Sequence, residues 1–200
     1  KGINAAQWVL QALSSLPVIQ QEGVCRFVLE ELGIFYDGNK LGISCEDKES
    51  GPLTLNVGNL FVGGGKNSTV SIDIRYPVTV DGEKIVEKIK SKAEAYGLKM
   101  EILEHKAPLY LPESDPFIQL LVSAYEDVSG RKAVVYSTGG GTYARTLQGR
   151  GVGFGGAFQE SGDTCVHSAN EHISVDDLKL HAQICLEAMY RMMTEDSELA

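Results

Sequence analysis

Hydrophobic residues recur at helical spacing at the beginning of the chain. Asn4 precedes an apolar series that ends before Pro17, and Gln7 stands three residues after Asn4, as in a capping box. A second apolar-periodic stretch covers residues 24–32 and ends at Gly33, a residue that tolerates the left-handed conformation after a helix. The pattern therefore predicts a broken pair of helices.

Two later stretches alternate apolar and polar residues, which is typical of half-buried strands. Residues 54–62 place Phe61 on the same face as Val57, and residues 69–76 alternate in the same way. The glycine-rich segment 63–67 lies between the two stretches and permits a tight turn. The sequence predicts an antiparallel hairpin here.

The elements around this hairpin predict a sandwich of helices and strands. Residues 37–51 are rich in turn formers and indicate a loop or a weak hairpin. Asp81 is positioned to cap a helix that runs to Tyr96, and residues 98–102 alternate as a further strand. The expected order, α-β-β-α-β, lacks only a leading strand of the split βαββαβ fold.

The second half of the chain has a different pattern. Prolines punctuate residues 108–116, which indicates a domain boundary. A helix is expected from about residue 117, short strands at 133–136 and 152–154, and a long helix over 174–193. This alternation predicts part of an α/β layer structure, so the expected fold class is α/β.

Composition narrows the class of protein. With 18 basic and 27 acidic residues the net charge is -9, which disfavours nucleic acid and anionic membranes as partners. No apolar run approaches the roughly 18 residues that a bilayer-spanning helix needs. This, with the lack of a basic-then-apolar leader, leads us to expect a cytoplasmic protein. The cysteines form no paired motif, which favours reduced thiols; they are Cys25, Cys45, Cys165 and Cys185.

Two features could bind an anion. The glycine run from Gly139 to Gly141, followed by Thr142, lies between a predicted strand and a helix and exposes consecutive backbone N–H groups. Such turns are common without a ligand, so a tight strand-to-helix turn is the default interpretation. Arg75 lies on the polar parity of its strand, where its guanidinium could bind a carboxylate or simply be solvated.

A polar loop before the last helix holds several side chains that can bind metal ions. They are Asp163, Cys165, His167, Glu171 and His172. Neither His-x-x-x-His nor paired-cysteine spacing is present, so a solvated loop remains the alternative to a metal site.

Six motifs, in order along the chain, resemble those of the PepV-type dipeptidases. They are GINAA, IDIRYP, LYLPESDPF, STGGGTYAR, GVGFGGAF and DTCVHSANEHIS. These dipeptidases belong to the dinuclear zinc peptidase superfamily that includes carnosinases, aminoacylases and carboxypeptidase G. The resemblance covers nearly the whole chain and corresponds to the C-terminal portion of such an enzyme.

The resemblance implies a role for each candidate residue. Residues 1–112 would be the later part of a lid domain, and residues 113–200 the closing part of the catalytic domain. His167 would be the last metal ligand, and Arg75 the lid arginine that binds the carboxylate of a dipeptide. The same subsite would include Gly139, Gly140, Gly141 and Thr142.

The chain also departs from the family pattern. The general base and the other zinc ligands of the family precede the lid, and no histidine here has an aspartate two residues later. A catalytic zinc site needs about three protein ligands. The chain is therefore expected to supply no catalytic base, to be inactive alone, and to need the N-terminal half of the catalytic domain as a partner.

Two other functions fit the same residues. The chain could be a stand-alone α+β interaction module whose glycine turn binds a small anion. It could also be part of an N-acyl amino acid deacylase of the same fold. A dipeptidase portion should bind metal when it is mixed with the N-terminal half, whereas an interaction module should not. Activity of the complete enzyme on dipeptides or on acyl amino acids would distinguish a dipeptidase from a deacylase.

Overall fold

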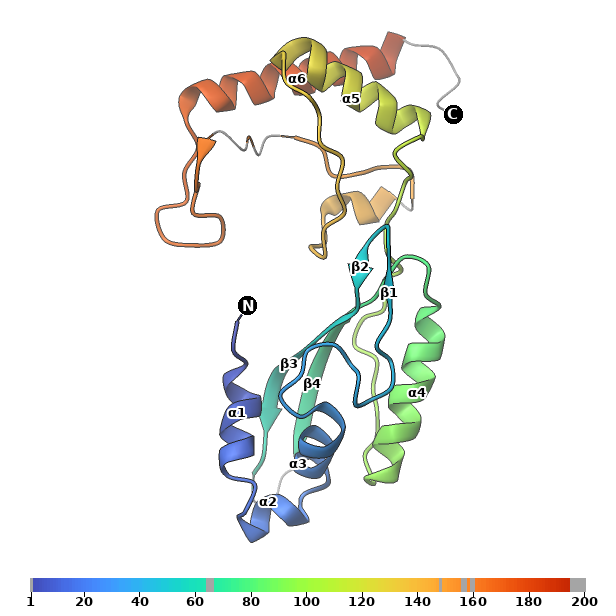
Figure 1. Ribbon diagram of the computed structural model, residues 1–200, viewed down its shortest axis with the longest axis vertical. Coiled ribbons are helices and arrows are strands. Elements are labelled where there is room, and N and C mark those ends of the chain that lie inside the picture. Colours follow the sequence, from blue (N-terminus) through green and yellow to red (C-terminus); the bar gives the residue numbers. More distant parts are fainter. Residues whose placement is uncertain (1, 64–66, 148, 156–157, 159–160, 195–200) are drawn as a thin grey trace. The chain divides into compact units, whose positions relative to one another are not determined.

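The computed structural model describes residues 2–63, 67–147, 149–155, 158 and 161–194. The chain divides into two compact units, residues 1–108 and 109–200 (Figure 1). The described part combines helices with small antiparallel sheets, which confirms the predicted α/β fold class. The lid and catalytic assignments of residues 1–112 and 113–200 remain predictions.

The first unit begins with short helices, as the apolar pattern predicts. They are α1 (Ala5–Ala12), α2 (Pro17–Gln21), α3 (Gly23–Phe27) and a π-helical turn, η1 (Val28–Leu32). Asn4 caps α1 by accepting the backbone N–H of Gln7 at 3.1 Å. Pro17 occupies the first turn of α2, where its missing N–H costs no hydrogen bond. Gly33, with φ of 60°, ends η1.

The predicted capping box is only half formed. Gln7 lies on the buried face of α1, and its Nε2 donates to the carbonyl of Gly33 at 2.8 Å. The backbone N–H of Asn4 instead donates to the hydroxyl of Tyr36 at 2.8 Å. The side chain of Gln7 therefore fastens α1 to the end of η1 instead of returning to its own cap.

Two small antiparallel sheets follow these helices. The first pairs β1 (Glu46–Asp47) with β2 (Gly51–Pro52), a weak hairpin of the kind expected within residues 37–51. The second pairs β3 (Thr54–Phe61) with β4 (Thr69–Arg75), which confirms the two longer strands. Of the predicted turn between them, residues 64–66 lie outside the described residues.

A bulge in β3 corrects the predicted position of Phe61. The register with β4 shifts between Val57 and Leu60. The N–H of Asn59 donates to the hydroxyl of Ser71 at 2.8 Å instead of to the strand ladder. Because the extra residue reverses the alternation, Leu60 packs against the core and Phe61 is 49% exposed.

The helix predicted after Asp81 is present, but the strand predicted after it is not. Asp81 caps α4 (Gly82–Ala95) by accepting the N–H of Glu83 at 3.0 Å. Residues 98–102, all of them described, join no strand ladder. Leu98 still packs against the core, so the alternation reflects burial without backbone pairing.

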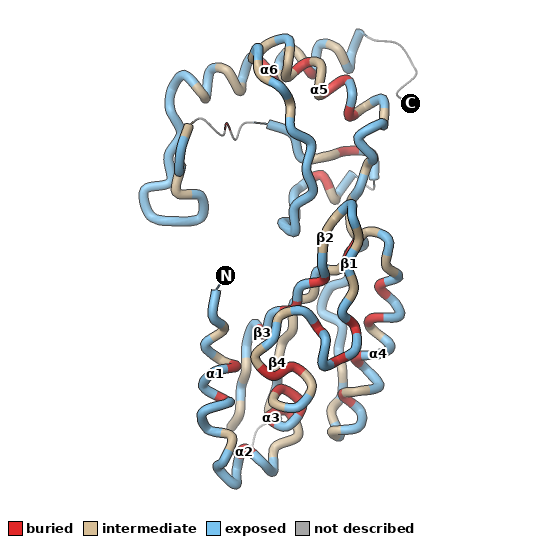
Figure 2. Tube along the Cα trace, viewed as in Figure 1, coloured by how far each residue is buried: buried red, intermediate tan, exposed pale blue. Residues whose placement is uncertain are grey.

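The core of the first unit lies between the β3–β4 sheet, η1 and α4 (Figure 2). Its buried side chains come from β3, η1 and α4, from the helices α1, α2 and α3, and from the loops before β1 and β3. The most enclosed include Phe27, Val28, Leu41, Leu53 and Val57. This packing fixes the face of β4 that points inward, and therefore the direction of Arg75.

The β1–β2 hairpin is tied to the chain beyond β4 by one carboxylate. Asp47 accepts hydrogen bonds from the N–H and hydroxyl of Ser50 at 2.6 and 2.8 Å, and from those of Thr79 at 3.2 and 3.0 Å. Burial alone would raise the pKa of Asp47, but these hydrogen bonds outweigh it and lower the pKa to about 2.

Because of this carboxylate, we expect the stability of the folded protein to decrease at acidic pH. Because its pKa in the folded chain, about 2, lies below the roughly 3.9 of an unfolded aspartate, Asp47 stabilises the fold above about pH 4. That contribution is lost as the pH falls towards 2. We expect Asp47→Asn to lower the thermal unfolding midpoint at pH 6, and the difference from the wild type to shrink steadily below pH 4. The exposed neighbour Glu49 serves as a control, since Glu49→Gln should show no such difference; equal pH profiles for both variants would contradict the prediction.

The second unit is built on two long helices. They are α5 (Pro116–Ser129) and α6 (Val175–Thr194), as predicted, and a short 3-10 turn, η2 (Tyr143–Leu147), lies between them in the chain. Their contact buries Leu120, Leu121, Ala124 and Ala188. None of the helices in the described part of the chain has the length and apolarity needed to span a bilayer.

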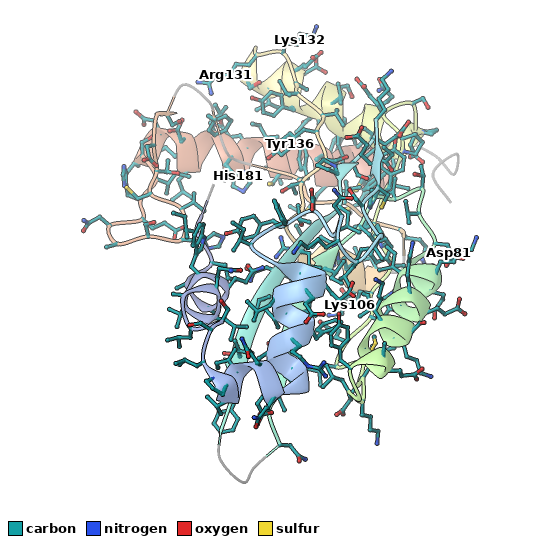
Figure 3. The ribbon with its side chains drawn as sticks, turned by 60° about the horizontal axis from the view of Figure 1, so that its bottom comes forward. Asp81, Lys106, Arg131, Lys132, Tyr136 and His181 are labelled. Carbon is teal, nitrogen blue, oxygen red and sulfur yellow. The ribbon has the colours of Figure 1, made fainter. Side chains whose placement is uncertain are left out.

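The strands predicted in the second unit are not formed. Residues 133–136 and 152–154 are described but join no ladder. Tyr136, which is labelled in Figure 3, is 73% exposed. A strand needs a hydrogen-bonding partner on at least one edge, and none of the described residues of this unit supplies one.

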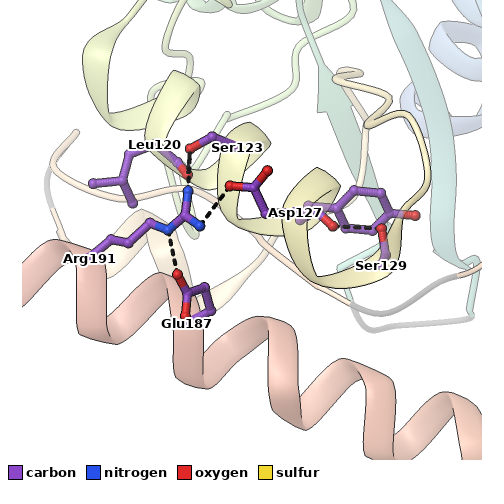
Figure 4. Close-up of polar contacts among 7 residues, drawn as sticks. Leu120, Ser123, Asp127, Ser129, Glu187 and Arg191 are labelled. Atoms are coloured by element: carbon purple, nitrogen blue, oxygen red, sulfur yellow. Dashed lines mark hydrogen bonds and ion pairs between the residues drawn. The ribbon is translucent and has the colours of Figure 1, made fainter.

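One arginine clamps α5 to α6 (Figure 4). The guanidinium of Arg191 lies 2.8 Å from the carboxylate of Asp127, 2.7 Å from that of Glu187 and 3.0 Å from the hydroxyl of Ser123. The hydrogen bonds to Asp127 and then Glu187 raise the pKa of Arg191. This clamp fixes α6, the helix that directly follows the polar loop with the candidate metal ligands.

Candidate functional site

Arg75 is the last residue of β4 and points away from the core. Ile74 packs inward, so Arg75 and Asp73 share the opposite, exposed face of the strand. Nε of Arg75 lies 3.4 Å from the Asp73 carboxylate, and 56% of the Arg75 side chain is exposed. The core thus holds the backbone below Arg75, while more than half of its side chain is exposed to solvent.

The glycine turn in the second unit is exposed throughout. Gly139, Gly140, Gly141 and Thr142 are all exposed, and η2 follows directly. The N–H of Gly140 donates to the hydroxyl of Thr138 at 3.3 Å. This contact stabilises the turn and shows that not every N–H of the glycine run points to solvent.

The structure adds a cation to this turn that the sequence analysis missed. A Cβ at Gly141 would lie 3.7 Å from Cζ of Arg145, a half-buried residue, so the guanidinium lies beside Gly141. The backbone N–H of Arg145 donates to the carbonyl of Thr142, which begins η2. The four-residue spacing from Gly141 to Arg145 was the signal available in the sequence. Arg145 makes the turn more favourable to an anion.

The loop that carries His167 has an unusual backbone. Cys165, His167 and Asn170 all have positive φ, at 56°, 60° and 65°. Side chains other than glycine adopt this region at a cost, and such residues concentrate at functional sites. His167 is exposed, and within the described part of the chain its imidazole has no hydrogen-bond partner.

Two other polar side chains of this loop, those of Asp163 and His172, are engaged locally. Asp163 accepts the N–H of Cys165 at 2.9 Å, and Nδ1 of His172 lies 2.8 Å from the carbonyl of Asn170. Among the residues that the structure describes, no three histidine, cysteine or acidic side chains gather closely enough to hold a metal ion. The described part of the loop therefore offers individual candidate ligands, His167 among them, and no complete metal site of its own.

The predicted site residues fall into both units. Arg75 belongs to the first unit, whereas the glycine turn and His167 belong to the second. Each group is held by its own unit: Arg75 by the β3–β4 sheet, and His167 by the loop that leads into α6.

Comparison with known proteins places the chain in a peptidase family. The sequence model of "Peptidase family M20/M25/M40" matches residues 8–191. Since that match spans most of the chain, the chain belongs to this family.

Two curated relatives give the family match more detail. A protein named "Putative dipeptidase" from Staphylococcus epidermidis is 32% identical over 196 residues, which is 98% of this chain and 41% of that protein. A similarly named protein from Staphylococcus haemolyticus is 32% identical over 195 residues, 97% of this chain and 41% of the relative. The chain spans about two fifths of the length of these relatives.

One of the solved structures that match the chain comes from the same family. It is the M20 family metallo-carboxypeptidase Sso-CP2 from Sulfolobus solfataricus, with 17% sequence identity and a TM-score of 0.48. The similarity covers 94% of this chain and 45% of that one.

Proposed function

We propose that the chain is the C-terminal portion of a zinc-dependent dipeptidase and supplies substrate-carboxylate binding and one metal ligand. The observation that supports this most directly is the match to proteins named as dipeptidases over 98% of the chain but only 41% of their length. On this proposal, the first unit belongs to the lid and the second to the catalytic domain.

The chain's own residues would position the substrate. Arg75 and the Gly139–Thr142 turn, with Arg145 beside it, would bind the free carboxylate of a dipeptide by charge-assisted hydrogen bonds. His167 would hold the metal at a fixed distance from that carboxylate. A fixed distance between the two ends of the site admits dipeptides and excludes longer chains.

The remaining chemistry belongs to groups outside these residues. A bound zinc ion would lower the pKa of a water molecule and polarise the scissile carbonyl. The general base and the other ligands are proposed to lie in the N-terminal half of the catalytic domain. Closure of the lid would bring Arg75 to the substrate, with the proline-rich segment near residues 108–116 as the hinge.

Substrate selectivity tests the proposal. An enzyme that joins this chain to the segment carrying the other ligands should hydrolyse dipeptides at least about 100-fold better than the same peptides with an amidated C-terminus, because the amide removes a charged hydrogen-bond acceptor. Tripeptides should also be poor substrates, and the isolated chain should show no hydrolysis.

Other outcomes would assign a different function. A preference for N-acetyl amino acids over dipeptides would make the protein a deacylase of the same family. If the joined protein neither binds zinc nor hydrolyses any of these compounds, the peptidase proposal fails and an interaction module becomes the better description.

A further inference from the structure

A single carboxylate closes the base of the loop that carries His167. We call residues 161–174 the His167 loop. Oδ2 of Asp177 accepts the hydroxyl of Ser161 at 2.6 Å and the hydroxyl of Ser174 at 2.8 Å. The two serines are the first and last residues of the loop, so the same oxygen holds both of its ends.

The same carboxylate is fixed by the beginning of α6. The N–H of Asp177 donates to the hydroxyl of Ser174 at 3.0 Å, and the N–H of Leu178 donates to the carbonyl of Ser174 at 3.0 Å. Ser174 is thus the N-cap of α6, and Asp177 lies in its first turn, where a negative charge is favoured by the helix dipole.

The chain entering the loop is anchored to α5. The N–H of Ser161 donates to the carbonyl of Phe158 at 3.1 Å. Phe158 is buried, and its ring stacks on Tyr125 of α5 with centroids 6.4 Å apart. The guanidinium of Arg131, labelled in Figure 3, lies 4.9 Å from the centre of the Phe158 ring.

These groups also favour the charged form of Asp177. Hydrogen bonds from Ser161 and Ser174 lower its pKa, and the nearby charge of Arg131 lowers it further. The carboxylate is therefore ionised at neutral pH, and each hydroxyl donates to a charged acceptor, which is the stronger type of hydrogen bond.

We infer that Asp177 is a positioning residue for His167: by joining Ser161 to Ser174 it holds the strained loop in the conformation that presents the imidazole to the metal. This rests on the proposed role of His167 as a metal ligand. Asp177 contacts neither metal nor substrate on this inference. Without the closure, the loop would relax from the positive φ values at Cys165, His167 and Asn170, and metal binding would have to restore them.

Three substitutions separate this role from a general effect on the helix. Asp177→Asn keeps the shape of the side chain but removes its charge. Ser161→Ala removes one anchor of the loop and leaves the Ser174 cap of α6 intact. Asp176→Asn is the matched control, because Asp176 is the preceding acid, its side chain is 96% exposed, and its ion pair is with Lys179 of the same helix at 3.8 Å.

The first measurement needs no metal. Hydrogen exchange in the metal-free chain reports the backbone N–H groups of Ser168 and His172, which donate within the loop to the carbonyls of Cys165 and Thr164. Asp177→Asn and Ser161→Ala should accelerate the exchange of both amides. Asp176→Asn should leave it as in the wild type, and the amides of α5 should be unaffected in all three variants.

The second measurement is zinc affinity in the enzyme that joins this chain to the other ligands, by competition with a chelator. Asp177→Asn and Ser161→Ala should each weaken zinc binding by about tenfold, the scale of outer-sphere effects at metal sites. Affinity within twofold of the wild type for both variants overturns the inference, whatever the exchange rates show. A loss confined to Asp177→Asn also overturns it, because the cause would then be the helix cap. If His167→Ala itself leaves the zinc affinity unchanged, the proposed function fails before the inference is reached.

Discussion

Replacing Arg75 with alanine in the complete enzyme is expected to lower kcat/KM for dipeptides by about 100-fold or more, because removal of one partner of a desolvated charge pair costs roughly 2–5 kcal/mol. The structure supports the role of Arg75 through its placement. The packed β3–β4 sheet fixes the backbone beneath Arg75, and its guanidinium projects from the exposed face of β4. Steady-state kinetics on a dipeptide series would measure the effect.

A substrate control isolates the carboxylate contact. For dipeptides with an amidated C-terminus, Arg75→Ala should change kcat/KM by less than about threefold, because the substrate no longer offers the charge that the guanidinium binds. Arg75→Lys should recover only part of the loss, since an ammonium group lacks the planar fork of donors. Lys84→Ala removes an 80% exposed cation from the same unit and should be neutral. Equal losses on free and amidated dipeptides would contradict the role of Arg75.

Replacing His167 with alanine should have the largest effect of all. We expect a loss of one zinc ion per enzyme and a fall in kcat of about 1,000-fold or more, because metal activation supplies several kcal/mol of transition-state stabilisation. Metal content after dialysis, together with kcat, would measure it. The exposed, strained position of His167 is what the structure contributes to this expectation.

A second histidine in the same loop provides the control. Nδ1 of His172 lies 2.8 Å from the carbonyl oxygen of Asn170. His172→Ala should retain full zinc content and lower kcat by less than about tenfold, which is below the range typical of residues that orient a metal ligand. A zinc loss equal to that of His167→Ala would mean that the motif resemblance selected the wrong histidine.

Helices were easier to predict than strands, and the reason is physical. The helix after Asp81 and the helix over 174–193 are defined by caps and by spacing within one segment, and both are present. A strand also needs a neighbour. Residues 98–102, 133–136 and 152–154 have the alternation or the apolar character of strands, but none of these segments joins a ladder in the described part of the chain.

Two smaller errors came from tertiary contacts that no local pattern contains. The exposed position of Phe61 follows from the bulge at Asn59, which is stabilised by Ser71 on the neighbouring strand. Gln7 has the spacing of a capping box, but the carbonyl of Gly33 takes its amide. In both cases a residue distant in sequence determined the outcome.

The same difference between local patterns and distant contacts applies to the candidate site. Arg75 was found from its parity along a strand, and His167 from a family motif. Arg145 and Asp177 were not singled out, because their relevance lies in contacts with Gly141 and with Ser161 that only the folded chain shows. The positive φ of His167 was not predicted either, because histidine is enriched at positive φ but adopts it in only a small fraction of cases.

The attachment of α1 has a consequence for self-association. A strand at the edge of a sheet offers unpaired backbone groups to other chains. On the outer edge of β3, the N–H of Leu55 donates to the carbonyl of Tyr36 at 2.7 Å, and the carbonyl of Val57 accepts from Nδ2 of Asn4 at 2.7 Å. An incoming strand would have to displace both contacts. Asn4 therefore caps a helix and also covers part of this edge, which disfavours the intermolecular strand pairing that begins aggregation.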